Sequence, residues 1–204
     1  MMTNSNRTRL IQVMLMTPVF FSSVSWAATE LGEIVVTAER RTESIQNVPL
    51  SVAAIGGGDV NLGKIVVLND VAFKTPGLTF SEFNVGEPRI YIRGIGNSSD
   101  SAASDQAVGV FLDEVYIGRT GGVGFDLFDL DRIEVLRGPQ GTLYGKNTNG
   151  GAISIVTARP SQDNELKVSA SIGNYGMTHV QALLNGGLTD SVAGKLVVSV
   201  KQRT

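Results

Sequence analysis

Apolar and polar residues alternate one by one along three stretches of the last quarter of the sequence. The apolar members are Leu166, Val168, Ala170 and Ile172, then Val180, Ala182 and Leu184, then Leu196, Val198 and Val200. Successive side chains of a strand point to opposite faces, so this period predicts three β-strands that each have one apolar face. Turn-forming residues at 174–176 and 189–191 predict antiparallel connections between them. Such a sheet suits either a soluble protein or the wall of a transmembrane β-barrel.

The first 27 residues have the layout of a secretory signal peptide. Arg7 and Arg9 precede an apolar stretch at 10–24, and small residues follow at Ala27 and Ala28. This stretch is shorter than the about 20 residues that a membrane-spanning helix needs. We therefore expect cleavage after Ala27 and a mature chain that is exported.

Cysteine content and charge exclude several classes of protein. The sequence contains no cysteine, so neither disulfides nor thiolate metal sites support the fold. The formal charge is -2, and removal of Arg7 and Arg9 with the leader brings it to -4 (-2 minus 2). An acidic chain has no general attraction to a polyanion, and we expect no nucleic-acid partner.

Residues 46–160 predict an α+β domain with a small mixed sheet. Strands are expected at 49–55, 78–80, 89–92, 108–112, 115–117, 132–136 and 152–157. We expect a loop at 56–58, and a short helix capped by Asn69 that ends before Pro76. Asp113 and Glu114 occupy a two-residue hairpin turn whose second position favours glycine, which predicts strain or a different turn there.

The segment 138–151 is rich in glycine and invites comparison with a phosphate-binding loop. Three residues separate Gly141 from Gly145 where a Walker loop has four, and Asn147 follows Lys146 where Ser or Thr would bind magnesium. We interpret the glycines instead as positions of left-handed or crowded backbone in a tight loop.

No recognisable catalytic constellation is present in the sequence. His179 is the one histidine, and it lies outside the expected domain on a predicted strand, so we expect neither a histidine-paired nucleophile nor a multi-histidine metal site. Asp126, Asp129, Asp131 and Glu134 lack the spacing of a calcium loop, and we expect them on a solvated loop and strand face. We expect no enzymatic activity, no cofactor and no metal site.

Arg93 and Arg137 each end an apolar strand and precede a glycine. A guanidinium group is permanently charged, so it needs carboxylate partners if it is buried. Two alternatives remain open: the partners lie on a surrounding structure, or both arginines are exposed and unpaired.

Five stretches, in this order, resemble TonB-dependent outer-membrane receptors. They are Glu-Ile-Val-Val-Thr-Ala at 33–38, Arg-Ile-Tyr-Ile-Arg-Gly at 89–94, Val-Phe-Leu-Asp-Glu-Val-Tyr at 110–116, Arg-Ile-Glu-Val-Leu-Arg-Gly-Pro-Gln-Gly-Thr-Leu-Tyr-Gly at 132–145 and Gly-Gly-Ala-Ile-Ser-Ile-Val-Thr at 150–157. The resemblance covers nearly everything after the leader, and its last two stretches are highly specific.

The resemblance implies a plug domain inside a 22-stranded transmembrane β-barrel. Residues 28–45 would carry the TonB box and a linker, 46–160 the plug, and 161–204 the first strands of an incomplete barrel. Three strands cannot close a barrel, so we expect either a truncated chain or a separate chain that supplies the rest. The implied location is the Gram-negative outer membrane, or the periplasm if the chain truly ends at Thr204.

The resemblance also assigns roles to individual residues. The TonB box, which would pair with the TonB energy transducer by strand addition, comprises Glu33, Ile34, Val35, Val36, Thr37 and Ala38. Composition alone instead favours an ordinary first strand of the domain there, followed by a flexible polar tether at 39–47. The signature loop of the plug comprises Gly138, Pro139, Gly141, Tyr144, Gly145, Gly150 and Gly151. Arg93 and Arg137 would form a lock with carboxylates of the barrel wall.

The implied function is the gating of active transport across the outer membrane. Loops at 83–86, 96–107 and 119–125 would face outward and contact the ligand, a ferric siderophore or a similar scarce nutrient. The alternative is a plug without a barrel, soluble in the periplasm, that binds a ligand or TonB.

Overall fold

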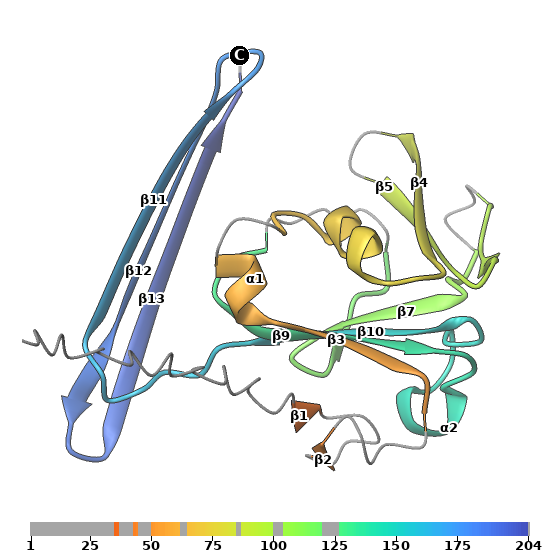
Figure 1. The fold of residues 1–204 in the computed structure, drawn as a ribbon, viewed down its shortest axis with the longest axis horizontal. Coiled ribbons are helices and arrows are strands. Elements are labelled where there is room, and N and C mark those ends of the chain that lie inside the picture. Colours follow the sequence, from red (N-terminus) through yellow and green to blue (C-terminus); the bar gives the residue numbers. More distant parts are fainter. Residues whose placement is uncertain are drawn as a thin grey trace, which may run out of the picture. The chain divides into compact units, whose positions relative to one another are not determined.

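The structure is a computed structural model (Figure 1). It describes residues 35–36, 43–44, 50–61, 65–84, 87–99, 104–119 and 127–203. The expected leader at 1–27 lies outside these residues. No described helix is long and apolar enough to cross a membrane.

Thirteen strands and three short helices make up the described chain. In chain order they are β1 (Val35–Val36), β2 (Glu43–Ser44), β3 (Val52–Gly56), α1 (Gly57–Asn61), the 3-10 helix η2 (Leu68–Lys74), β4 (Leu78–Asn84), β5 (Glu87–Ile92), β6 (Ile95–Gly96), β7 (Val108–Leu112), β8 (Val115–Tyr116), β9 (Leu130–Arg137), α2 (Gly141–Tyr144), β10 (Gly151–Thr157), β11 (Glu165–Gly173), β12 (Met177–Thr189) and β13 (Val192–Gln202).

A five-stranded sheet with the order β3-β9-β10-β7-β8 forms the centre of the first domain. β10 runs parallel to β7 and antiparallel to β9, so the sheet is mixed, as the sequence predicts. Its centre is buried on both faces. Ile133, Val135, Ile153 and Ile155 belong to the larger hydrophobic core, which also contains residues of η2, β4 and β5.

The opposite face of this sheet has a second, smaller hydrophobic cluster. Phe111, Leu136 and Ala152 contribute to it from β7, β9 and β10, and Val36 of β1 completes its buried members. The near-continuous apolar run of β10 follows from this burial on both faces, because such a strand has no solvent side on which polar residues are required.

Two local expectations are wrong. The three consecutive glycines at 56–58 end β3 and begin α1 instead of forming a loop, and a Cβ on Gly57 would lie 1.9 Å from the Leu130 carbonyl oxygen. Asn69 does not cap η2, because it lies inside the helix; the N-cap residue is Val67, and Asp70 in the first turn supplies the side-chain contact. The Asp70 carboxylate accepts the backbone N–H groups of Val66 and Val67 at 2.8 and 3.0 Å.

The hairpin between β7 and β8 turns through two non-glycine residues with positive φ. Asp113 has φ 45° and Glu114 has φ 69°, so the turn keeps the left-handed backbone of a two-residue hairpin. Of the two expected outcomes, strain is confirmed and a different turn is not. The Asp113 carboxylate accepts hydrogen bonds from the backbone N–H and the hydroxyl group of Thr157, at 2.9 and 2.8 Å. These bonds hold the turn against the end of β10 and offset part of its backbone strain.

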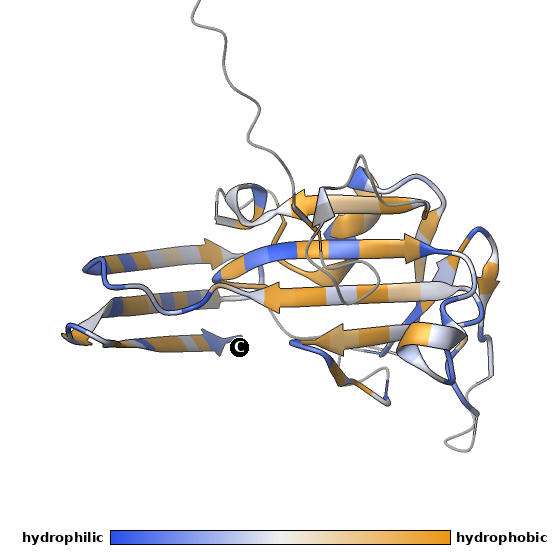
Figure 2. Cartoon of the chain, turned by 90° about the horizontal axis from the view of Figure 1, so that it is seen from below, coloured by the Kyte–Doolittle hydropathy of each residue, from blue (hydrophilic) through white to orange (hydrophobic). Residues whose placement is uncertain are grey.

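The last three strands form a separate antiparallel sheet with the order β11-β12-β13. Their register places the alternating apolar residues in rows on one face: Leu166, Leu184 and Leu196, then Val168, Ala182 and Val198, then Ala170, Val180 and Val200. The alternation is visible as bands along the strands (Figure 2). Leu166 is 70% exposed and Ile172 is 87% exposed, so this apolar face is uncovered by the described residues.

Candidate functional site

Two arginines that are far apart in the sequence meet at one end of the five-stranded sheet. Arg93 follows β5, and its Nη2 donates to the Ser51 hydroxyl at 3.0 Å. Arg137 ends β9, its backbone N–H donates to the Ser51 carbonyl at 2.9 Å, and its Nη1 donates to the Pro76 carbonyl at 3.3 Å. Ser51 therefore contacts both arginines. The sequence alone gives no indication of this shared contact.

Backbone hydrogen bonds also fix the position of Arg93 next to Arg137. The Arg93 N–H donates to the Gly77 carbonyl at 2.7 Å, next to the Pro76 carbonyl that Arg137 uses. Arg93 has φ 53°, a left-handed conformation that costs a non-glycine residue on the order of 1 kcal/mol. The buried Arg137 Nε has no hydrogen-bond partner among the described residues. Both guanidinium groups thus donate to neutral oxygens, which leaves their positive charge available to a carboxylate outside the described part of the chain.

The glycine-rich loop between β9 and β10 is tightly built. Gly138, Gly145 and Gly151 have positive φ angles of 104°, 81° and 148°, and a Cβ on Gly150 would lie 2.9 Å from the Ile95 carbonyl oxygen. These four positions confirm left-handed or crowded backbone in this loop. Gly141 has neither property, because a Cβ on it would meet nothing within 4 Å and its φ is not positive.

Hydrogen bonds and aromatic contacts hold the same loop closed. The N–H groups of Gly138 and Gln140 donate to the carbonyls of Gly150 and Thr148, at 3.1 and 3.0 Å. On α2, the Tyr144 ring lies 5.0 Å from the Phe111 ring in an edge-on arrangement. The exposed Pro139 lies in the same turn. The loop therefore has the character of a rigid connector between the two central strands, with no feature of a nucleotide site.

Only part of the predicted TonB box lies within the described residues. Val35 and Val36 form β1, whereas Glu33, Ile34, Thr37 and Ala38 lie outside them. β1 pairs antiparallel with β2, so the expectation of a flexible tether at 39–47 is wrong for Glu43 and Ser44, which form this second strand. Val36 is fully buried among Phe111, Leu136 and Ala152, and such burial holds even a two-residue ladder in place. The other edge of β1 has no partner among the described strands.

The acidic residues of this region are less solvated than the sequence suggests. Glu134 is fully buried on β9, and Arg132 Nε donates to it at 2.7 Å. Asp129 is also buried, and its carboxylate forms an ion pair with Lys195. Asp131 is exposed as expected, and Asp126 lies outside the described residues. A solvated acidic face is therefore wrong for Asp129 and Glu134, because both acquire basic partners.

Histidine and acidic residues do not gather into a metal site in the described chain. His179 lies on the polar face of β12, where it is buried and its Nε2 is 2.9 Å from the Ser199 hydroxyl oxygen. This contact joins two neighbouring strands and brings a histidine within hydrogen-bond distance of a hydroxyl group, a pairing that was not expected from the sequence.

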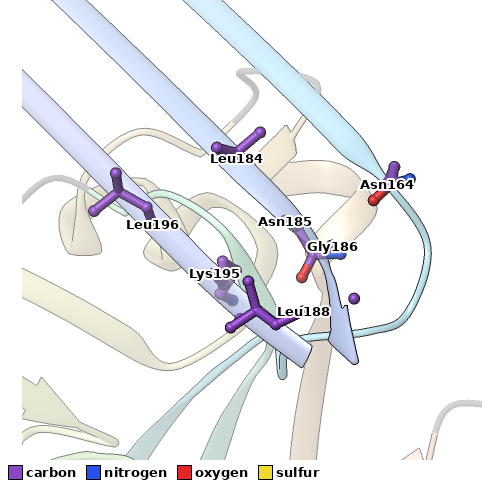
Figure 3. Close-up of a pocket in the computed structure, with 9 residues that line it drawn as sticks. Asn164, Leu184, Asn185, Gly186, Leu188, Lys195 and Leu196 are labelled. Carbon is purple, nitrogen blue, oxygen red and sulfur yellow. The ribbon is translucent and has the colours of Figure 1, made fainter. Parts of the chain in front are cut away.

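A groove of about 370 Å³ lies near the turn between β12 and β13 (Figure 3). Leu184, Leu188 and Leu196 line it together with Gly186 and other residues of these strands. Its walls are mostly aliphatic, and the lining set contains no histidine, serine or carboxylate. The groove belongs to the apolar face and supplies no catalytic chemistry.

The predicted ligand-facing loops are described in part. Residues 85–86, 100–103 and 120–126 lie outside the description, while Asn97, at the start of the second loop, donates from its amide to the Ser104 hydroxyl and the Asp105 carbonyl. The contact of these loops with a ligand remains a prediction.

A family model of the TonB-dependent receptor plug domain matches residues 44–152, which is more than half of the chain. The chain belongs to the TonB-dependent receptors. Among curated relatives of this receptor are the vitamin B12 transporter BtuB of Photobacterium profundum and the pesticin receptor of Yersinia pestis. BtuB is 25% identical over 187 residues, which cover 90% of this chain and 30% of BtuB. The pesticin receptor is 28% identical over 173 residues, which cover 83% of this chain and 25% of the relative.

Solved structures of such receptors have the same fold. The ferric yersiniabactin uptake receptor FyuA of Yersinia pestis superposes with a TM-score of 0.65 and 25% identity, over 74% of this chain and 24% of FyuA. The pyoverdine outer-membrane receptor FpvA of Pseudomonas aeruginosa superposes with a TM-score of 0.70 and 21% identity, over 86% of this chain and 26% of FpvA. The mixed-sheet plug and the antiparallel strands after it are therefore confirmed. This receptor chain spans less than a third of the length of each of these proteins.

Proposed function

We propose that this chain is the gating plug of an outer-membrane active transporter together with the first strands of its barrel wall. The observation that carries the proposal is the plug-family match at residues 44–152, directly followed by a sheet with one exposed apolar face. A plug blocks a pore, and an antiparallel sheet with alternating faces suits a wall between lipid and lumen. The relatives are receptors and transporters, which accords with a protein that is not an enzyme.

The transported ligand in this proposal is a ferric siderophore or a similarly scarce nutrient. BtuB is by name a vitamin B12 transporter, and the Pseudomonas putida relative is a ferric-pyoverdine receptor. Ligand would bind the outward loops at 83–86, 96–107 and 119–125, and movement of the plug would then open a path.

The TonB energy transducer is the partner in this proposal, and β1 is its docking strand. The edge of β1 that has no partner among the described strands suits strand addition, in which main-chain hydrogen bonds supply affinity. Glu33, Ile34, Thr37 and Ala38 would extend this strand on both sides of Val35 and Val36.

Arg93 and Arg137 are proposed as the lock between plug and barrel wall. Their shared position at Ser51 places two positive charges together, and their hydrogen bonds to Ser51 and Pro76 leave both charges without a carboxylate among the described residues. A barrel carboxylate facing this pair would make charge-assisted bonds to both groups at once.

Uptake by the full receptor that contains this chain tests the proposal. We expect energy-dependent uptake of a labelled ferric siderophore or cobalamin under scarcity of that nutrient, and loss of uptake when TonB is deleted. Val36→Pro is expected to abolish uptake, because proline removes a ladder donor from β1. Val36→Ala keeps that donor but shortens the same buried side chain, so it is the control for loss of packing. Normal uptake by Val36→Pro would contradict the docking strand. A product found only in the soluble periplasmic fraction would replace transport by ligand or TonB binding.

A further inference from the structure

One lysine of the second sheet contacts both central strands of the plug at the same end. Lys195 of β13 forms an ion pair with Asp129, and its Nζ also donates to the Ala158 carbonyl. Asp129 immediately precedes β9, and Ala158 immediately follows β10. The Ala158 N–H donates back to the Asp129 carbonyl at 3.1 Å, so the three residues form one connected junction.

The residue opposite Lys195 holds the chain that leaves the plug. Asn185 of β12 is the cross-strand partner of Lys195 and is buried. Its Oδ1 accepts the Ser161 N–H at 3.1 Å, and its Nδ2 donates to the Ser161 hydroxyl at 2.9 Å and the Asp163 carbonyl at 2.7 Å. Two neighbouring residues of the second sheet therefore hold the connection 158–163 along its length.

Burial distinguishes this ion pair from pairs on the surface. The Lys195 and Asp129 side chains are 13% and 9% exposed, whereas those of Lys167 and Glu165 are 41% and 46% exposed. A buried pair gains little net stability, but loss of one member leaves the other charge buried and uncompensated. Such a pair therefore contributes more to fixing the relative positions of its two segments than to net stability. Asp129 also has φ 57°, so the backbone adopts a disfavoured conformation where it presents this carboxylate.

We infer that Asp129, Lys195 and Asn185 form a clamp that fixes one end of the plug sheet, where β9 begins and β10 ends, to the barrel wall. The inference rests on the proposed function and deepens it, because it separates a fixed part of the plug from a part that moves. The clamp holds β9 and β10 at one end, and Arg93 and Arg137 lie with Ser51 at the opposite end of β9. Opening of the arginine lock then leaves the plug attached at the clamp, which acts as its pivot.

Cross-linking of the full receptor tests whether the clamp stays closed during transport. Residues 1–204 contain no cysteine, so Asp129→Cys with Lys195→Cys introduces the thiols of this region. We expect a short bismaleimide to join the two positions, and the joined receptor to keep the uptake rate of the same variant before cross-linking. Failure to cross-link would overturn the contact, and loss of uptake on cross-linking would overturn the fixed pivot.

Charge reversal provides a second test that does not depend on uptake. Lys195→Asp is expected to speed exchange of the Ala158 amide hydrogen by about tenfold or more, since it places two carboxylates together in a buried site. Asp129→Lys with Lys195→Asp is expected to restore slow exchange. The exposed pair Glu165→Lys with Lys167→Glu is the matched control, and its single variants are expected to leave exchange unchanged.

The two tests separate failure of the clamp from failure of the proposed function. A receptor without uptake in its unaltered form would refute transport, while the exchange measurement would still report on the clamp. If the double reversal does not restore protection that Lys195→Asp removes, the ion pair is not the element that holds the junction, and the inference is wrong.

Discussion

The two sheets of this chain use the same kinds of apolar residue in opposite ways. In β9 and β10, Ile133, Val135, Ile153 and Ile155 are essentially inaccessible to solvent. In β11 and β13, Leu166, Ile172 and Leu196 are well over half exposed. A plug sheet is stabilised by protein packed on both faces, whereas the second sheet has an apolar face that suits lipid. In the proposed function, one chain therefore forms both a sheet buried in protein and a sheet with one face against lipid.

Truncation of a core isoleucine is expected to give the largest contrast between the two sheets. Ile153→Ala deletes three carbons from a fully buried site and is expected to lower the free energy of unfolding of the plug by about 2–5 kcal/mol. Ile172→Ala, at an 87% exposed position, is expected to change it by less than about 0.5 kcal/mol. Hydrogen exchange of the β9 and β10 amides measures both variants, and equal losses would remove the contrast.

Substitutions of glycine are expected to show a smaller difference, in which the plug again loses more stability than the second sheet. A Cβ on Gly151 of the plug would lie 2.3 Å from the Leu136 carbonyl oxygen, with φ at 148°. Gly151→Ala is therefore expected to cost about 2–3 kcal/mol of plug stability. A Cβ on Gly187 of β12 would lie 2.1 Å from Gln162 Oε1, the far end of a flexible side chain.

Gly187→Ala is the matched variant, because Gln162 can rotate where the Leu136 backbone cannot. We expect it to cost less than about 0.5 kcal/mol. Within the plug, Gly141→Ala is the control for added helix propensity without a clash. Thermal unfolding followed by circular dichroism ranks the three, and a cost for Gly187 as large as that for Gly151 would contradict the expected order.

The smallest expected difference in stability is between substitutions in two hairpin turns, one in each sheet. Glu114 in the plug and Tyr175 in the second sheet both have positive φ, 69° and 59°. Glu114→Gly is expected to stabilise the plug by about 0.5 kcal/mol, because glycine adopts this conformation without steric cost. Tyr175→Gly gains the same relief but loses the Arg203 guanidinium over the Tyr175 ring, at 4.9 Å, so its net effect is expected near zero. Chemical denaturation of each variant measures the difference, and destabilisation by Glu114→Gly would refute strain in the plug turn.

Local patterns in the sequence predict most of the strands. Alternation at 166–200 locates β11, β12 and β13. The two-residue turn at Asp113 and Glu114 has the left-handed backbone that such a hairpin requires, and the missing glycine makes it strained. These features depend on residues that are near one another in the chain. A period of two and a turn residue need no knowledge of distant partners.

Features that depend on distant residues could not be read from the sequence. The helix at Gly57 is set by close approach to the Leu130 backbone. Glu134 is buried because β9 lies between β3 and β10, and Asp129 is buried against Lys195. The alternation does place Lys195 and Asn185 on the polar face of their strands. It does not indicate which plug residues they contact. The contacts of Arg93 and Arg137 with Ser51 likewise join residues that are far apart in the sequence.

Site-directed spin labelling of the full receptor in lipid vesicles tests most directly that one chain serves as plug and wall. Single labels would replace successive residues from Leu196 to Val200 on β13, with a label at Asp131 of the plug as the aqueous reference. We expect accessibility to lipid-soluble oxygen to rise and fall with a period of two, with maxima at Leu196, Val198 and Val200. Uniform accessibility to a water-soluble relaxation agent along β13 would contradict the role of this sheet as a wall.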